Sequence, residues 1–174
     1  GRWDSVPTPR EFISFASNIR QIMKNMGSED KTISQALRPW AKILCFDMAS
    51  VLTEELGEIL KSRQQELRAE RDAIPKPIDS SDIDFLTLNE KIRSIDEFVN
   101  SRLRKLHLYE LEDFPDRFMS IFEEVPQIDK SIIEAQRIRA TKFAGGMTSL
   151  KLNQTLPESE LWIEELNKSE DGNA

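Results

Sequence analysis

The residues of this chain best suited to chemistry are a histidine and a glutamate three positions apart. On a helix, His107 and Glu110 would share one face, where both could ligate a metal ion. A di-iron helical bundle needs two such pairs and further carboxylates, and this chain contains a single histidine. We therefore interpret His107 and Glu110 as surface residues and expect neither a metal nor another cofactor.

Carboxylates also cluster along the chain, and such clusters can bind hard cations or supply acid and base groups. They lack the alternating spacing and the central glycine of a calcium-binding loop. Solvent-exposed helix faces are the simpler interpretation. The clusters are Glu54, Glu55 and Glu58, and then Glu110, Glu112, Asp113 and Asp116.

Nucleophilic and nucleotide-binding motifs are equally poorly supported. Cys45, the only cysteine, has the apolar neighbours Leu44 and Phe46, a context typical of a buried, reduced thiol. The pair Gly145-Gly146 follows an expected helix, whereas phosphate-binding glycines precede one, so it indicates a helix end. We expect a protein that is not an enzyme.

Two basic clusters make the best case for nucleic-acid binding, provided that they converge into one groove. Against this, the net charge of the chain is −7, and few aromatic residues accompany the cations. A basic patch of this kind could equally bind an acidic protein segment. The clusters are Arg102, Arg104 and Lys105, and Arg137, Arg139 and Lys142.

The elements that must position these residues are dominated by a long helix expected over residues 39–73. Its first half is apolar on nearly every face, as in a helix surrounded by partners. Its second half is mostly charged, so we expect this end to project into solvent, with Leu67 available to a partner. A shorter helix is expected from Ser28 to Leu37, ending or kinking before Pro39.

A second long helix is expected over residues 87–113, antiparallel to the first. Pro75 and Pro77 mark the reversal, and Thr87 with Glu90 has the spacing of a capping box. Its apolar residues follow a spacing close to a heptad. They are Leu88, Ile92, Ile95, Val99 and Leu106.

Shorter helices are expected on either side of this pair. Thr8-Pro9 predicts the start of a first helix that ends at Gly27, and Phe114-Pro115 predicts the start of another. A further helix should run from Val125-Pro126 to Gly145-Gly146, followed by a weak extended stretch at residues 149–153.

The last part of the chain, residues 147–174, is expected to be a flexible segment that contains a short amphipathic acidic helix at about 157–166. Such a helix could bind a hydrophobic groove, either on its own bundle or on a partner. The sequence favours neither alternative. Its apolar residues are Leu161, Trp162, Ile163 and Leu166.

These observations predict an all-α fold, a bundle of about five to seven helices formed by residues 1–146. We expect an interaction or assembly subunit that binds protein partners, or copies of itself, through its helices. A nucleic-acid-associated subunit is the less favoured alternative. No run of about eighteen apolar residues and no signal peptide is evident, so we expect an intracellular protein, either cytoplasmic or nuclear.

Overall fold

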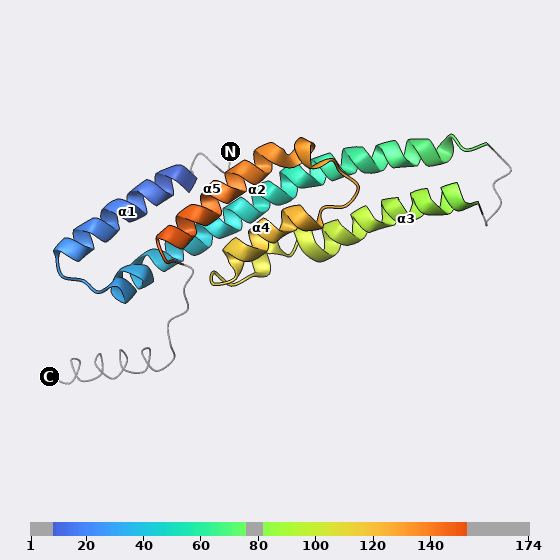
Figure 1. Cartoon of the computed structure of the whole chain (residues 1–174). Helices are drawn as coiled ribbons and strands as arrows, with labels where there is room; N and C mark the ends of the chain where they lie inside the picture. Colours follow the sequence, from blue (N-terminus) through green and yellow to red (C-terminus); the bar gives the residue numbers. More distant parts are fainter. Residues whose placement is uncertain (1–8, 76–81, 153–174) are drawn as a thin grey trace, which may run out of the picture.

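The computed structural model describes residues 9–75 and 82–152, and within these ranges the chain is all-α, with no strand. Five α-helices form an elongated bundle (Figure 1). The predicted fold class is thereby confirmed. The helices are α1 (Pro9–Asn25), α2 (Asp30–Asp72), α3 (Ile83–Phe98), α4 (Phe114–Glu124) and α5 (Glu134–Ser149).

Helix α2 runs the length of the bundle, and α3 lies antiparallel along its second half (Figure 1). With 43 residues, α2 is about 65 Å long. Leu60 on α2 and Ile95 on α3 are buried in the common core. The buried amide of Gln64 donates hydrogen bonds to Ile92 O at 3.1 Å and to Asp96 Oδ1 at 2.7 Å, linking the two helices through polar contacts as well.

The prediction that the long helix begins at Pro39 was wrong, because α2 is continuous from Asp30. A proline inside a helix removes one backbone hydrogen bond and costs about 3 kcal/mol. Pro39 is exposed, whereas Leu37 and Ala41 on either side of it are buried. Continuous burial of that side of the helix offsets the cost, and the proline ring remains on the solvent side.

Helix α3 begins earlier and ends earlier than the expected 87–113. Its N-cap is Asp82, whose side chain accepts a hydrogen bond from Phe85 N at 3.1 Å, so the predicted capping box at Thr87 does not start the helix. After Phe98 the chain forms a π-helical turn at Val99–Leu103 and a 3-10 turn at Leu106–Leu108. These turns bring the chain back towards α2, where Thr53 Oγ1 donates to Leu103 O at 3.2 Å.

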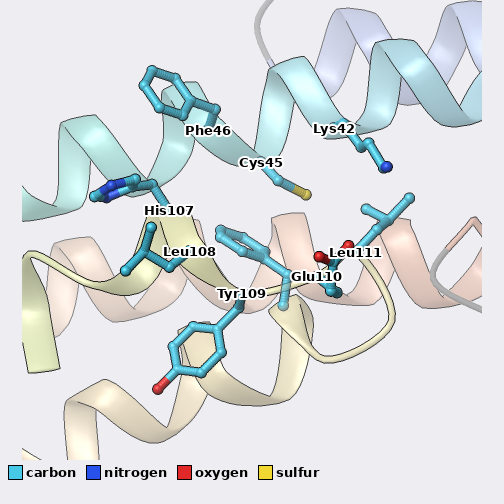
Figure 2. Close-up of a pocket in the computed structure, with 9 residues that line it drawn as sticks. Lys42, Cys45, Phe46, His107, Leu108, Tyr109, Glu110 and Leu111 are labelled. Atoms are coloured by element: carbon cyan, nitrogen blue, oxygen red, sulfur yellow. The ribbon is translucent and has the colours of Figure 1, made fainter.

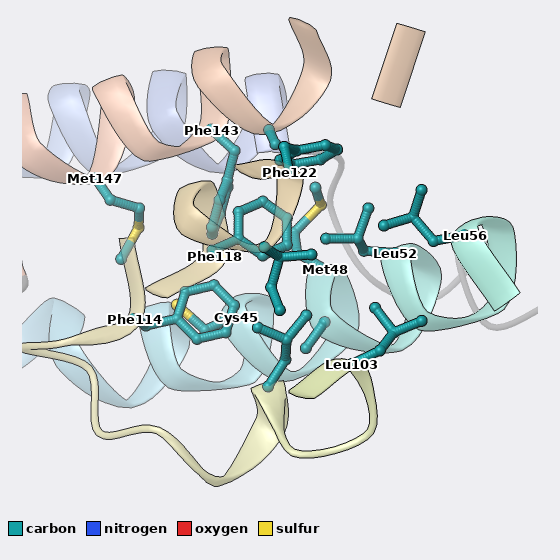
Figure 3. Packing of buried hydrophobic residues seen from close by; sticks show 14 of the residues in the cluster. Cys45, Met48, Leu52, Leu56, Leu103, Phe114, Phe118, Phe122, Phe143 and Met147 are labelled. Carbon is teal, nitrogen blue, oxygen red and sulfur yellow. The ribbon is translucent and has the colours of Figure 1, made fainter. Parts of the chain in front are cut away.

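Helices α4 and α5 pack beside the first half of α2 around three aromatic rings (Figure 3). Phe118 stacks on Phe114 with a centroid separation of 5.1 Å and meets Phe143 edge to face at 5.7 Å. The predicted start of α4 at Phe114 is confirmed. Helix α5 begins later than predicted, because Asp129 caps a 3-10 turn at Lys130–Ile133 before the helix starts.

The predicted helix end at Gly145-Gly146 was also wrong, since α5 continues to Ser149. Gly146 lies against Ile13 of α1, so the absence of a side chain allows close packing of the two helices. Residues beyond it belong to the core, where Met147 and Leu152 are fully buried. The expected extended stretch at 149–153 is therefore a helix end followed by a turn as far as residue 152.

Alanine substitution of the two glycines should separate packing from helix propensity. A Cβ at Gly145 would meet no atom within 4 Å, so Gly145→Ala should stabilise the fold by about 0.5–1 kcal/mol. A Cβ at Gly146 would lie 2.1 Å from Ile13 Cδ1, so Gly146→Ala should be less stable than Gly145→Ala by about 1 kcal/mol. Urea unfolding followed by circular dichroism measures both. Equal stability of the two variants would contradict close packing of α1 on α5.

The remaining predicted helix, at 157–166, lies outside the described residues. Helix α1 is already helical at Pro9, the first described residue, and Gly27 adopts a φ of 84° just after its end, as expected for a helix-terminating glycine. Among the described helices, none combines the length and apolarity required to cross a membrane.

Candidate functional site: an exposed apolar face on α2

One exposed apolar surface of the described chain is a stripe on the first half of α2. Trp40 is 55% exposed, Ile43 52% and Phe46 48%. Successive spacings of three residues place these side chains on one side of the helix over about two turns. We call this surface the apolar α2 face. It comprises Ala36, Pro39, Trp40, Ile43 and Phe46.

The face exists because this half of α2 is apolar all round while its neighbours cover only part of it. Leu37, Leu44 and Met48 point into the core and are almost completely buried. The described residues leave the other side uncovered. Single exposed apolar residues are common on proteins, but a contiguous group that includes tryptophan and phenylalanine is typical of an interaction surface.

The connection between α3 and α4 extends this surface and forms a pocket beside it (Figure 2). The His107 ring meets the Phe46 ring edge to face with centroids 5.8 Å apart, and Leu108 is 66% exposed. The pocket has a volume of about 230 Å³. It is lined by Lys42, Cys45, Phe46, Leu111 and Phe114, and by residues 107–110 of the connection.

The pocket holds reactive residue types without an arrangement that activates them. Burial raises the pKa of the Cys45 thiol to about 12, so the thiolate needed for nucleophilic attack is not formed near neutral pH. His107 lies in a 3-10 turn and Glu110 follows that turn, so they do not share a helix face as the sequence suggested. Within residues 9–75 and 82–152, no group of three or more potential metal ligands lies together.

The first basic cluster lies on the turn that follows α3. Arg102 pairs with Glu124 at 3.8 Å. Arg104 lines a second pocket, of about 420 Å³, together with Glu54 and Phe46. Lys105 is exposed. Carboxylates therefore accompany two of the three cations, which weakens the local positive potential.

The second basic cluster lies on α5. Arg139 pairs with Glu55 of α2 at 2.9 Å, and Arg137 pairs with Glu134. The hydrogen bond from Arg137 is the main reason why the pKa of the Glu134 carboxyl is lowered. Lys142 is exposed.

The two basic clusters do not form one groove along α2. Thr53 donates a hydrogen bond to the carbonyl of Leu103, which lies between Arg102 and Arg104 of the first cluster. Glu55 accepts a hydrogen bond from Arg139 of the second cluster. Two residues along an α-helix correspond to a rotation of about 200°, so Thr53 and Glu55 point to nearly opposite sides of α2. The convergence required for a shared basic groove is therefore absent among the described residues.

The prediction that Leu67 is available to a partner was wrong. The side chain is 0% exposed and belongs to the common core, so it cannot contact a partner in this fold. Leu60, Gln64 and Leu67 are all buried, and their spacings of four and three match a heptad seam. That spacing is visible in the sequence, but the charged residues between these positions predict a solvated projection.

Sequence reasoning did not select the apolar α2 face as a site, although it recognised that this half of the helix is apolar all round. The four predicted tail residues, Leu161, Trp162, Ile163 and Leu166, lie outside the described residues. No family model, curated protein or solved structure matches this chain. A function for this chain can therefore be inferred only from its surface.

Proposed function

We propose that this chain is a non-catalytic interaction or assembly subunit that binds a protein partner through the apolar α2 face. The observation that carries the proposal is the half-exposure of Trp40, Ile43 and Phe46 on consecutive turns of one helix. A partner that covers these side chains would remove a large apolar area from water, which stabilises a complex by about 25 cal/mol per Å² before the costs of association. Large aromatic side chains are also the commonest energetic centres of protein interfaces.

The geometry favours an apolar helix as the bound element. The exposed stripe runs along α2, and Leu108 lines the same adjoining pocket as Phe46, so the surface is elongated. An amphipathic helix presents apolar residues at intervals of three and four, so it can contact Trp40, Ile43 and Phe46, which follow one another at intervals of three. His107 and Lys42 supply polar groups at the edge of this surface.

Affinity capture with the full chain as bait tests this function. Ile43→Asp places a carboxylate in the centre of the face and should reduce capture of a specific partner at least tenfold, equivalent to about 1.4 kcal/mol. The matched control is Ile132→Asp, since Ile132 is 59% exposed but lies on the 3-10 turn before α5. Circular dichroism establishes that both variants are folded. Loss of the partner with both variants, or with neither, would contradict the proposal.

Nucleic-acid binding remains the alternative, and salt separates it from the first proposal. An apolar interface should persist at moderate salt, whereas binding through phosphates weakens steeply as salt rises. The pairing of Arg102, Arg137 and Arg139 with carboxylates argues for the protein partner. Salt-sensitive binding of an oligonucleotide that is unaffected by Ile43→Asp would favour the alternative.

A further inference from the structure

The described chain ends against the first half of α2, the half that carries the uncovered apolar face. Leu152, the last described residue, is 1% exposed, and its carbonyl accepts a hydrogen bond from Arg38 Nη1 at 3.4 Å. The guanidinium of Arg38 also pairs with Glu112 in the connection between α3 and α4. Lys42, one helical turn beyond Arg38, lines the pocket next to the apolar α2 face. The segment after residue 152 therefore starts on the Arg38 side of α2, one helical turn from the pocket that adjoins this surface.

The apolar residues that follow are within reach of it. Five residue steps separate Leu152 from Pro157, and an extended chain covers about 17 Å in five steps. An α-helix with its side chains is about 10–12 Å across, and ten residues of helix span about 15 Å. Residues 153–156 can therefore pass round α2, and a segment of the length of 157–166 matches the distance from Ala36 to Phe46.

The charges of the two surfaces are complementary. The segment 157–166 contains four glutamates around its apolar residues and no basic residue. Two exposed cations, Lys42 and Arg104, line the two pockets that include Phe46, each pocket also containing one carboxylate, Glu110 or Glu54. Opposite charges at the rim of an apolar contact favour one binding partner over others.

We propose that Pro157–Leu166 binds in cis to the apolar α2 face and that a protein partner must displace it. This inference rests on the function proposed above, because it concerns the same surface. Attachment to the same chain gives the segment an effective concentration in the millimolar range, so a weak contact suffices to occupy the face. The conformational entropy lost when the segment becomes ordered offsets much of the free energy gained by burying its apolar side chains. The contact is therefore weak enough for a partner to displace the segment.

Footprinting of the full chain tests this inference directly. Side chains are oxidised by short pulses of hydroxyl radicals and quantified by mass spectrometry. The variant Leu161→Asp/Ile163→Asp removes apolar contacts from the segment, and oxidation of Trp40 and Phe46 should then rise at least threefold. The matched control Asn167→Asp/Asn173→Asp adds the same charge at polar positions and should leave both residues as in the wild type. Ile132 serves as the internal reference.

A reciprocal variant and a dilution series complete the test. Ile43→Asp should increase oxidation of Trp162 at least threefold, because the segment loses its binding surface. Oxidation of Trp40, Phe46 and Trp162 that is unchanged by these variants would overturn the inference. Protection that disappears on tenfold dilution, together with a dimeric mass in light scattering, would also overturn it, because a second copy would then cover the face.

The same variants distinguish failure of this inference from failure of the proposed function. If the segment covers the face, Leu161→Asp/Ile163→Asp should increase partner capture several-fold, while Ile43→Asp abolishes it. Capture that depends on Ile43 without any change in the footprint would retain the proposed function and reject cis binding. A footprint that changes as expected without Ile43-dependent capture would support cis binding and reject the proposed partner site.

Discussion

Ile95→Asp is expected to unfold the protein or to lower its stability by several kcal/mol. Ile95 is 2% exposed and belongs to the core shared by α2 and α3. A carboxylate at this position would be taken out of water without a compensating partner, and that cost is a large fraction of the 5–15 kcal/mol that stabilises an ordinary domain. Thermal and urea unfolding monitored by circular dichroism measure the loss.

The control for this variant is the same substitution on the same helix. Ile83 is 77% exposed at the first turn of α3, where a carboxylate is also favoured by the helix dipole. Ile83→Asp should therefore leave the melting temperature within a few degrees of the wild type. Similar melting temperatures for Ile95→Asp and Ile83→Asp would show that α3 does not pack against α2 as described.

The all-α class and the seam of α3 could be predicted because helical periodicity is a local property of the sequence. The spacing of Ile92 and Ile95 alone predicts that they lie in the seam, and both are buried. Helix ends were less predictable, because they depend on competing caps and on distant packing. Asp82 caps α3 in preference to Thr87, and α5 continues through Gly146 because it packs against α1.

The candidate site was less accessible to sequence reasoning than the fold. An apolar helix face has the same sequence pattern whether it is buried or exposed, so Trp40 and Leu44 could not be distinguished before their neighbours were placed. The structure distinguishes them, with exposures of 55% and 1%. Ion pairs between elements were unpredictable for the same reason, and Arg139 with Glu55 joins residues that are 84 positions apart.

Substitution of Leu67 should also have a large effect, because this residue is buried and not exposed as the sequence predicts. As part of a solvated projection, Leu67→Asp would leave the fold intact. In the structure the side chain is 0% exposed, so the same variant should destabilise the protein about as strongly as Ile95→Asp. Leu67→Ala should cost about 2–5 kcal/mol, because it removes buried methyl groups and leaves a cavity.

Ala69→Asp is the matched control, because Ala69 is exposed two residues further along α2. It introduces the same carboxylate into the same helical segment at a solvated position, so its expected cost is only the small difference in helix propensity, about 0.5–0.7 kcal/mol. Amide hydrogen exchange near Leu67 adds a local measurement. Slow exchange in the wild type that becomes fast in Leu67→Asp but not in Ala69→Asp would establish that α3 covers the second half of α2. A Leu67→Asp variant as stable as Ala69→Asp would instead support a second half of α2 that projects into solvent. A carboxylate packed between two helices could stay hydrated only if the helices separated, and that separation would lower the stability.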